Sequence, residues 1–127
     1  MENGRGVIMT KIFIVSDSIV DPFQTSFYDS YNIEVSNNSS NPNQIMITNY
    51  ANLKNTQNIP LTIIAQVSGT SINIASQLIL GPSSEATVDY IQVDESSGYY
   101  SNDSIYFNLS YSDRYDPYYG DCWGKKN

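Results

Sequence analysis

The residues in this sequence that could do chemistry are carboxylates and hydroxyls, because histidine is absent and cysteine occurs once, at Cys122. Histidine is the usual general acid–base near neutral pH and the commonest metal ligand. A lone cysteine permits neither an internal disulfide nor a cysteine-based zinc cluster, which leaves a free thiol in a C-terminal tail or an intermolecular disulfide. No nucleophile-elbow or phosphate-loop motif is present. The sequence therefore predicts a protein that is not an enzyme and has no cofactor.

Carboxylates gather in the C-terminal stretch SDRYDPYYGDCWG as Asp113, Asp116 and Asp121. Oxygen ligands in a loop that contains glycine are the ligands that calcium prefers, but this spacing does not match an EF-hand. We interpret these residues, together with Asp94 and Glu95, as solvated acidic turns and predict no metal site. Two carboxylates alone can cleave a glycoside, so a small hydrolase stays open as a minor alternative.

The same stretch is rich in aromatic residues: Tyr115, Tyr118, Tyr119 and Trp123. Such side chains combine a large apolar face with a polar edge, and protein interfaces favour them. We predict that they contact a neighbouring subunit. Stacking on sugars and folding back over the domain are the alternatives.

Four Asn-X-Ser sequons begin at Asn37, Asn38, Asn102 and Asn108. The first two lie in the polar run SNNSSNPN, the third lies in a second polar loop (94–103), and Asn108 falls, with Tyr106, on the expected outward face of the strand 104–111. All four positions are therefore accessible, as an N-linked glycan requires. We predict N-glycosylation at these residues if the protein is extracellular.

Composition favours an extracellular, cell-surface or virion protein. Only 15% of the residues are charged, the formal net charge is −7, and the six lysine and arginine residues are scattered. Binding to nucleic acid or to an anionic membrane surface requires clustered basic residues, so the sequence excludes both as main partners. The surface must instead be built from uncharged polar side chains and tyrosine.

The apolar stretch VIMTKIFIVSDSIV (7–20) is too interrupted, by Lys11 and Asp17, for a membrane span or a secretory signal. We interpret it as a strand of the mature protein. A leader that is missing from the sequence, a misplaced start, and release of a virus particle by lysis remain open as explanations of its export.

Short apolar runs between turn residues predict an all-β fold. We expect strands at 7–15, 31–35, 44–49, 59–67, 71–80, 85–93 and 104–111, with 59–67 and 71–80 forming a hairpin around Gly69. About seven strands at this spacing favour an immunoglobulin-like two-sheet sandwich, with a jelly roll as the alternative. The expected organisation is an N-terminal strand (1–20), a sandwich domain (21–112) and a Tyr/Asp-rich tail (113–127).

Three stretches resemble an adhesion-type immunoglobulin-like module of the CARDB kind: IMITN (45–49), IPLTIIAQVSGTSINIASQLIL (59–80) and LGPSSEATV (80–88). The resemblance covers about half of the chain, and Gly81-Pro82 reverses the Pro-Gly order that is commoner in that family. The Ser/Asn/Tyr/Ile-rich composition also resembles surface proteins of thermoacidophilic archaea and their viruses. These resemblances imply a non-catalytic surface domain, and sandwiches of this kind build filaments, some of which are linked by a donated N-terminal strand.

The function expected from these features is a structural subunit of an extracellular filament or virus particle that assembles with copies of itself or with other surface subunits. A donated strand must be apolar and carry free backbone groups, which points to residues 7–15; pairing of this strand within its own chain is the alternative. The expected interface residues are Val7, Ile8, Ile12, Phe13, Ile14, Val15, Tyr118, Tyr119 and Trp123. The alternative function is an extracellular carbohydrate-binding or adhesion module.

Overall fold

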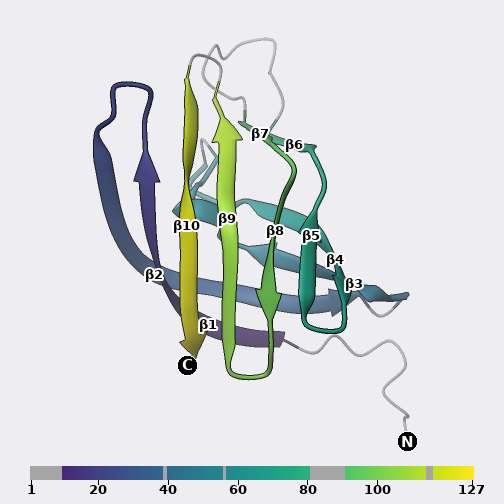
Figure 1. Cartoon of the computed structure of the whole chain (residues 1–127). Helices are drawn as coiled ribbons and strands as arrows, with labels where there is room; N and C mark the ends of the chain where they lie inside the picture. The colour runs from purple at the N-terminus through teal and green to yellow at the C-terminus, as the bar shows by residue number, and fades with distance from the viewer. Residues whose placement is uncertain (1–9, 39, 56, 81–90, 114–115) are drawn as a thin grey trace, which may run out of the picture.

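A computed structural model describes residues 10–38, 40–55, 57–80, 91–113 and 116–127 of the chain (Figure 1). Within these ranges the elements are β1 (Thr10–Val20), β2 (Ser26–Asn38), β3 (Asn41–Thr48), the 3-10 helix η1 (Tyr50–Asn52), β4 (Thr62–Ser68), β5 (Ser71–Ile74), β6 (Gln77–Leu80), β7 (Ile91–Val93), β8 (Ser96–Tyr100), β9 (Ser104–Ser112) and β10 (Pro117–Lys126). The prediction of an all-β protein is therefore confirmed.

The strands form a closed antiparallel barrel, and the predicted immunoglobulin-like sandwich and its jelly-roll alternative are wrong. Eight strands pair in the ring β1-β2-β3-β4-β5-β8-β9-β10, and β10 closes it by pairing with β1. The β6–β7 hairpin is attached to one end of β9. Alternation of apolar and polar residues shows only that one face of each strand is buried, which a sandwich and a barrel share. The pairing of the first strand, β1, with the last, β10, is what distinguishes the barrel from a sandwich.

The inside of the barrel is packed with side chains. Each strand of the ring turns one face inward, and the largest fully buried side chains include Phe13, Ile33, Ile47, Ile63, Ile72, Phe107 and Leu109. Tyr50 of η1 adds its ring to this core, stacked on Phe107 at 6.1 Å between centroids. An eight-stranded barrel has an interior just wide enough for side chains to fill, and this one uses it as a hydrophobic core.

The predicted hairpin around Gly69 is confirmed as β4 and β5, which pair from Ser68 opposite Ser71. Gly69 has φ +61°, a conformation that glycine adopts without a steric penalty. The expected strand 71–80 is divided into β5 and β6, and of the expected strand 85–93 only Ile91–Val93 lies within the described residues.

The predicted C-terminal tail is also wrong, because most of it is β10, a ring strand with β1 on one side and β9 on the other. The loop expected at 94–103 likewise contains β8. Both strands were missed because some inward positions are glycines, so the apolar alternation is lost. A Cβ atom on Gly98 would overlap the carbonyl oxygen of Tyr106, and one on Gly124 would overlap that of Ile14. Glycine thus lets neighbouring backbones approach closely where the sheet curves.

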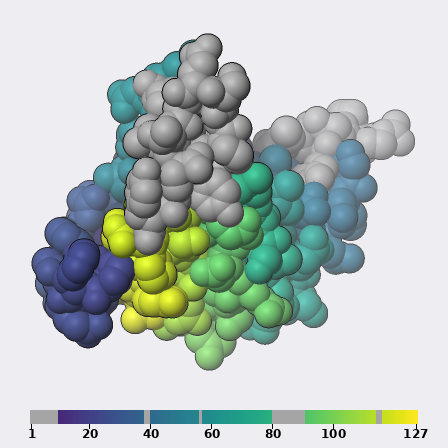
Figure 2. Space-filling view, turned by 90° about the horizontal axis from the view of Figure 1, so that it is seen from above, coloured from purple at the N-terminus to yellow at the C-terminus, as the bar shows by residue number. Residues whose placement is uncertain are grey.

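The N-terminal strand pairs within its own chain in this structure. β1 is hydrogen-bonded to β2 along one edge and to β10 along the other. The β1–β2 hairpin projects at one end of the barrel with β1 still paired to β10 as far as Val20, and Figures 1 and 2 show the hairpin beside β10. In the part of the chain that the structure describes, no helix is long and apolar enough to cross a membrane.

Candidate functional site

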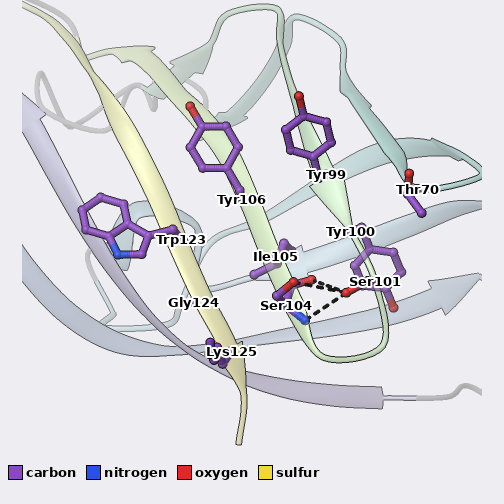
Figure 3. Close-up of a pocket in the computed structure, with 10 residues that line it drawn as sticks. All are labelled: Thr70, Tyr99, Tyr100, Ser101, Ser104, Ile105, Tyr106, Trp123, Gly124 and Lys125. Atoms are coloured by element: carbon purple, nitrogen blue, oxygen red, sulfur yellow. Dashed lines mark hydrogen bonds between the residues drawn. The ribbon is translucent and has the colours of Figure 1, made fainter.

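Three aromatic side chains stand side by side on the outer face of the barrel (Figure 3). Tyr99 of β8 lies opposite Tyr106 of β9, and Tyr106 lies opposite Trp123 of β10. The rings of Tyr99 and Tyr106 are 6.0 Å apart between centroids and tilted by 30°. Tyr99 is 66% exposed and Trp123 is 44% exposed. We call these three residues the aromatic row.

Local sequence explains why these rings point outward. Successive side chains on a strand alternate between faces, so Ile105 and Phe107 turn inward on either side of Tyr106. Cys122 is fully buried beside Trp123 in the same way. Burying the apolar neighbours therefore holds the three rings on the solvent side, on three adjacent strands.

A hydrogen-bonded polar cluster borders the aromatic row. The Tyr106 hydroxyl donates to Asp121 Oδ1 over 2.8 Å, and Asn108 Nδ2 donates to the same oxygen and to the Tyr106 hydroxyl, each over 3.0 Å. The bond to Asp121 raises the pKa of Tyr106, so the phenol stays a neutral donor and its ring orientation is fixed. Among the described residues no partner is recorded for Asp121 Oδ2 or Asn108 Oδ1, which leaves both oxygens able to accept from a ligand.

Two hollows adjoin the aromatic row, and Trp123 lines both of them. The first has a volume of about 310 Å³ and is lined by the three rings together with Thr70, Ser101, Ser104 and Lys125, among others. The second has a volume of about 570 Å³ and is lined by Ser16, Asp17, Tyr28, Asp29, Ser30 and Trp123. The surface thus combines flat apolar rings with hydroxyl and carboxylate groups, a combination typical of sites for small polar ligands.

The electrostatics of this surface disfavour an anionic ligand. Asp121 borders the aromatic row, and Asp29 lines the second hollow. Lys125 is the one basic residue among the described lining residues of the two hollows. The chain as a whole carries a net charge of −7. A ligand without negative charge is therefore the better match, since it meets no charge repulsion.

A second polar cluster is buried inside the barrel. Asp17 is 2% exposed; its Oδ2 accepts from the Tyr31 hydroxyl over 2.7 Å, and Oδ1 has no partner among the described atoms. Burial raises the pKa of Asp17, and it also raises the pKa of Cys122, which lies 4.0 Å from the Tyr31 hydroxyl, to about 12. Since Cys122 is a buried thiol and not a residue of an exposed tail, it is poorly placed for an intermolecular disulfide.

The predicted interface residues lie in different environments and do not form one surface. Phe13 and Val15 are in the core, whereas Ile12 and Ile14 are exposed on the outer face of β1. Tyr118 packs on Tyr111 with 5.2 Å between ring centroids, and Tyr119 is exposed further along β10. Trp123 is the one member that belongs to the aromatic row. Val7 and Ile8 lie outside the described residues.

The sequons occupy three parts of the surface. Asn37 is partly buried on β2, and the side chain of Asn38 lies outside the described part of the structure. Asn102 is exposed in the β8–β9 turn and accepts a hydrogen bond from Lys11 over 2.8 Å. Asn108 is exposed on β9, within the polar cluster. A glycan on Asn108 and a ligand on the aromatic row would compete for the same surface.

The C-terminal carboxylates do not converge. Asp113 accepts from the backbone N–H of Asp116 over 2.7 Å and from the Tyr118 hydroxyl over 3.3 Å, which closes a local turn. Asp121 lies apart from them, on β10 and in the polar cluster. Within the described ranges no three potential ligands gather into a metal site.

Sequence reasoning missed most of the aromatic row. It selected Trp123 but assigned Tyr99 to a polar loop and Tyr106 only to the outward face of a strand. The available signal was the pair of tyrosines in SSGYY and the outward alternation of Tyr106 with Asn108. Neither shows that β8 and β10 lie on either side of β9.

Comparisons with protein-family models, with curated proteins and with solved structures found no match for this chain.

Proposed function

We propose that this protein binds carbohydrate through the outer face of its barrel. The observation that carries the proposal is the aromatic row, in which Tyr99, Tyr106 and Trp123 stand in register on three adjacent strands. One face of a pyranose ring carries mainly C–H groups and is apolar, while its rim carries hydroxyls. Aromatic rings contact such a face, and nearby acceptors orient the rim.

The polar cluster supplies the acceptors. Asp121 and Asn108 are tied to Tyr106, so their free oxygens are held in place before a ligand arrives. Preorganised groups lose little conformational entropy on binding, which favours a site on a rigid sheet over one on a loop. A neutral glycan fits the acidic surroundings better than one that carries uronate or sulfate groups, which require clustered basic residues.

The test is gel electrophoresis of the native protein through polyacrylamide that contains a neutral polysaccharide: a β-glucan, a xylan or a mannan. We expect at least one polysaccharide to retard the protein and Trp123→Ala to abolish the retardation. Phe23→Ala is the matched control, because Phe23 is 78% exposed on the projecting hairpin and lines neither hollow. Equal mobility with and without every polysaccharide, or retardation that survives Trp123→Ala, would refute the proposal.

A structural subunit of an extracellular assembly is the second candidate. It is favoured by Ile12 and Ile14, two large apolar side chains exposed together on the outer face of β1, which an interface would cover. Because both edges of β1 are paired, such an assembly would use the faces of strands and not strand donation. Sedimentation velocity of the native protein and of Ile12→Ser/Ile14→Ser tests it: oligomers that dissociate in the double variant are expected, and a monomeric native protein contradicts it.

A further inference from the structure

The aromatic row continues past Trp123 as a line of hydroxyl-bearing residues. Ser16 of β1 lies opposite Trp123, and Ser30 of β2 lies opposite Ser16. The full line therefore crosses five neighbouring strands, β8, β9, β10, β1 and β2, with aromatic rings on the first three and serines on the last two. The two hollows lie along this line and meet at Trp123.

The neighbouring line of outward residues is polar throughout. Asn108 lies opposite Asp121, Asp121 opposite Ser18, and Ser18 opposite Tyr28. Tyr28 is 76% exposed and lines the second hollow. An aromatic ring thus occurs at both ends of the surface, with hydroxyl, amide and carboxylate groups between the ends.

From this arrangement we propose that the ligand is an extended, neutral oligosaccharide chain that lies across the strands, passes over Trp123 and reaches Tyr28. The inference rests on the proposed function and adds to it the length, the direction and the second half of the site. Four strand spacings of about 4.8 Å make the line about 19 Å long, measured along the curved wall of the barrel. One sugar unit of an extended chain is about as long as one strand spacing, so the line accommodates roughly four or five units.

The chemistry of the line favours a β-1,4-linked chain of hexoses or pentoses. Such a chain is extended and ribbon-like, so consecutive sugar rings would meet Tyr99 and Tyr106, whose ring centroids are 6.0 Å apart, and then Trp123 on the adjacent strand. Beyond Trp123 the ligand would exchange hydrogen bonds with the Ser16 hydroxyl and donate one to the Ser30 hydroxyl, whose own proton is donated to the carbonyl oxygen of Val15, before its last unit contacts Tyr28. The carboxylate of Asp121, beside the aromatic row, opposes acidic sugars.

The experiment is isothermal titration calorimetry with β-1,4-linked glucose, mannose and xylose oligomers, from the disaccharide to the hexasaccharide. For at least one series we expect affinity to rise up to the tetrasaccharide or beyond. Tyr28→Ala should lower affinity roughly tenfold for the long oligomers, the change that accompanies loss of one stacking contact, and leave the disaccharide unaffected. Phe27→Ala is the matched control, since Phe27 is the residue that precedes Tyr28 on β2 and points to the opposite face.

The outcomes separate the two proposals. The extended line would be overturned if affinity stops rising at the disaccharide and Tyr28→Ala leaves binding unchanged. If Trp123→Ala still abolishes binding in that case, the proposed function is retained. Binding that is indifferent to Trp123→Ala, or the absence of binding to every oligomer and polysaccharide tested, would refute both.

Discussion

Replacing Tyr31 by phenylalanine removes a single hydroxyl that serves the buried carboxylate of Asp17. The hydroxyl donates to Oδ2 over 2.7 Å, and Oδ1 has no partner among the described atoms. A hydrogen bond to a charged group contributes about 1.5–3 kcal/mol to stability, and one between neutral groups contributes about 1 kcal/mol. We therefore expect Tyr31→Phe to lower the free energy of unfolding by about 2 kcal/mol when Asp17 is ionised and by about 1 kcal/mol when it is protonated.

The pH dependence follows from the pKa of Asp17, which burial raises above its ordinary value of 3.8 while the Tyr31 hydrogen bond opposes the rise. As pH rises above 3.8, the unfolded chain releases this proton first, so stability falls until pH passes the folded-state pKa and is then constant. The charge of Asp29 also raises the pKa of Asp17, by less than burial does. Tyr31 and Cys122 are the other titratable groups in this buried cluster. Removal of the Tyr31 hydroxyl raises the folded-state pKa of Asp17 further, which is why the variant loses more stability at high pH.

Urea unfolding of both proteins at a series of pH values, from below 3.8 to neutral, measures this difference. Tyr119→Phe is the control, because Tyr119 is an exposed tyrosine on β10, and its change should stay within about 0.5 kcal/mol. A Tyr31→Phe loss that is the same at every pH, or no loss at all, would refute the reasoning.

Three further predictions concern the packing of the barrel. Because Cys122 is buried and its pKa is raised to about 12, iodoacetamide should alkylate it only in denaturant, as read by mass spectrometry; rapid labelling of the native protein would contradict its placement. Phe107→Ala should cost about 3–5 kcal/mol in urea unfolding, since Phe107 is fully buried against Tyr50, and a loss below about 1 kcal/mol would contradict a filled interior. Gly98→Ala should cost about 1–3 kcal/mol or more because its Cβ would overlap the Tyr106 carbonyl, whereas Ser97→Ala, an exposed neighbour, should change stability by about 0.5 kcal/mol or less.

Much of the strand content could be predicted from the sequence, because strands with one buried face have a readable pattern. The alternation of Ile105, Phe107 and Leu109 identified β9 and its outward residues, and Gly69 identified the turn between β4 and β5. The same pattern failed at β8 and β10, where Gly98, Gly120 and Gly124 replace some of the expected inward apolar residues. The closed barrel could not be predicted, since alternation within a strand does not determine which strands are neighbours.

The candidate site depends on information that the sequence does not display. Tyr99, Tyr106 and Trp123 become adjacent only through the pairing of β8 with β9 and of β9 with β10. Trp123 was recognised as an aromatic residue with a surface role, but its neighbours on the other strands were not. The cluster of Tyr106, Asn108 and Asp121 likewise joins residues on two strands whose register was unknown before the structure.

The most direct test of the central claim is an NMR titration of the ¹⁵N-labelled protein with the hexasaccharide that binds best. We predict that the largest shifts fall on the Trp123 indole N–H and on the backbone amides of Tyr99, Tyr106 and their neighbours in β8, β9 and β10. Shifts concentrated on β3 and β4, on the opposite side of the ring, would contradict a sugar-binding surface at the aromatic row.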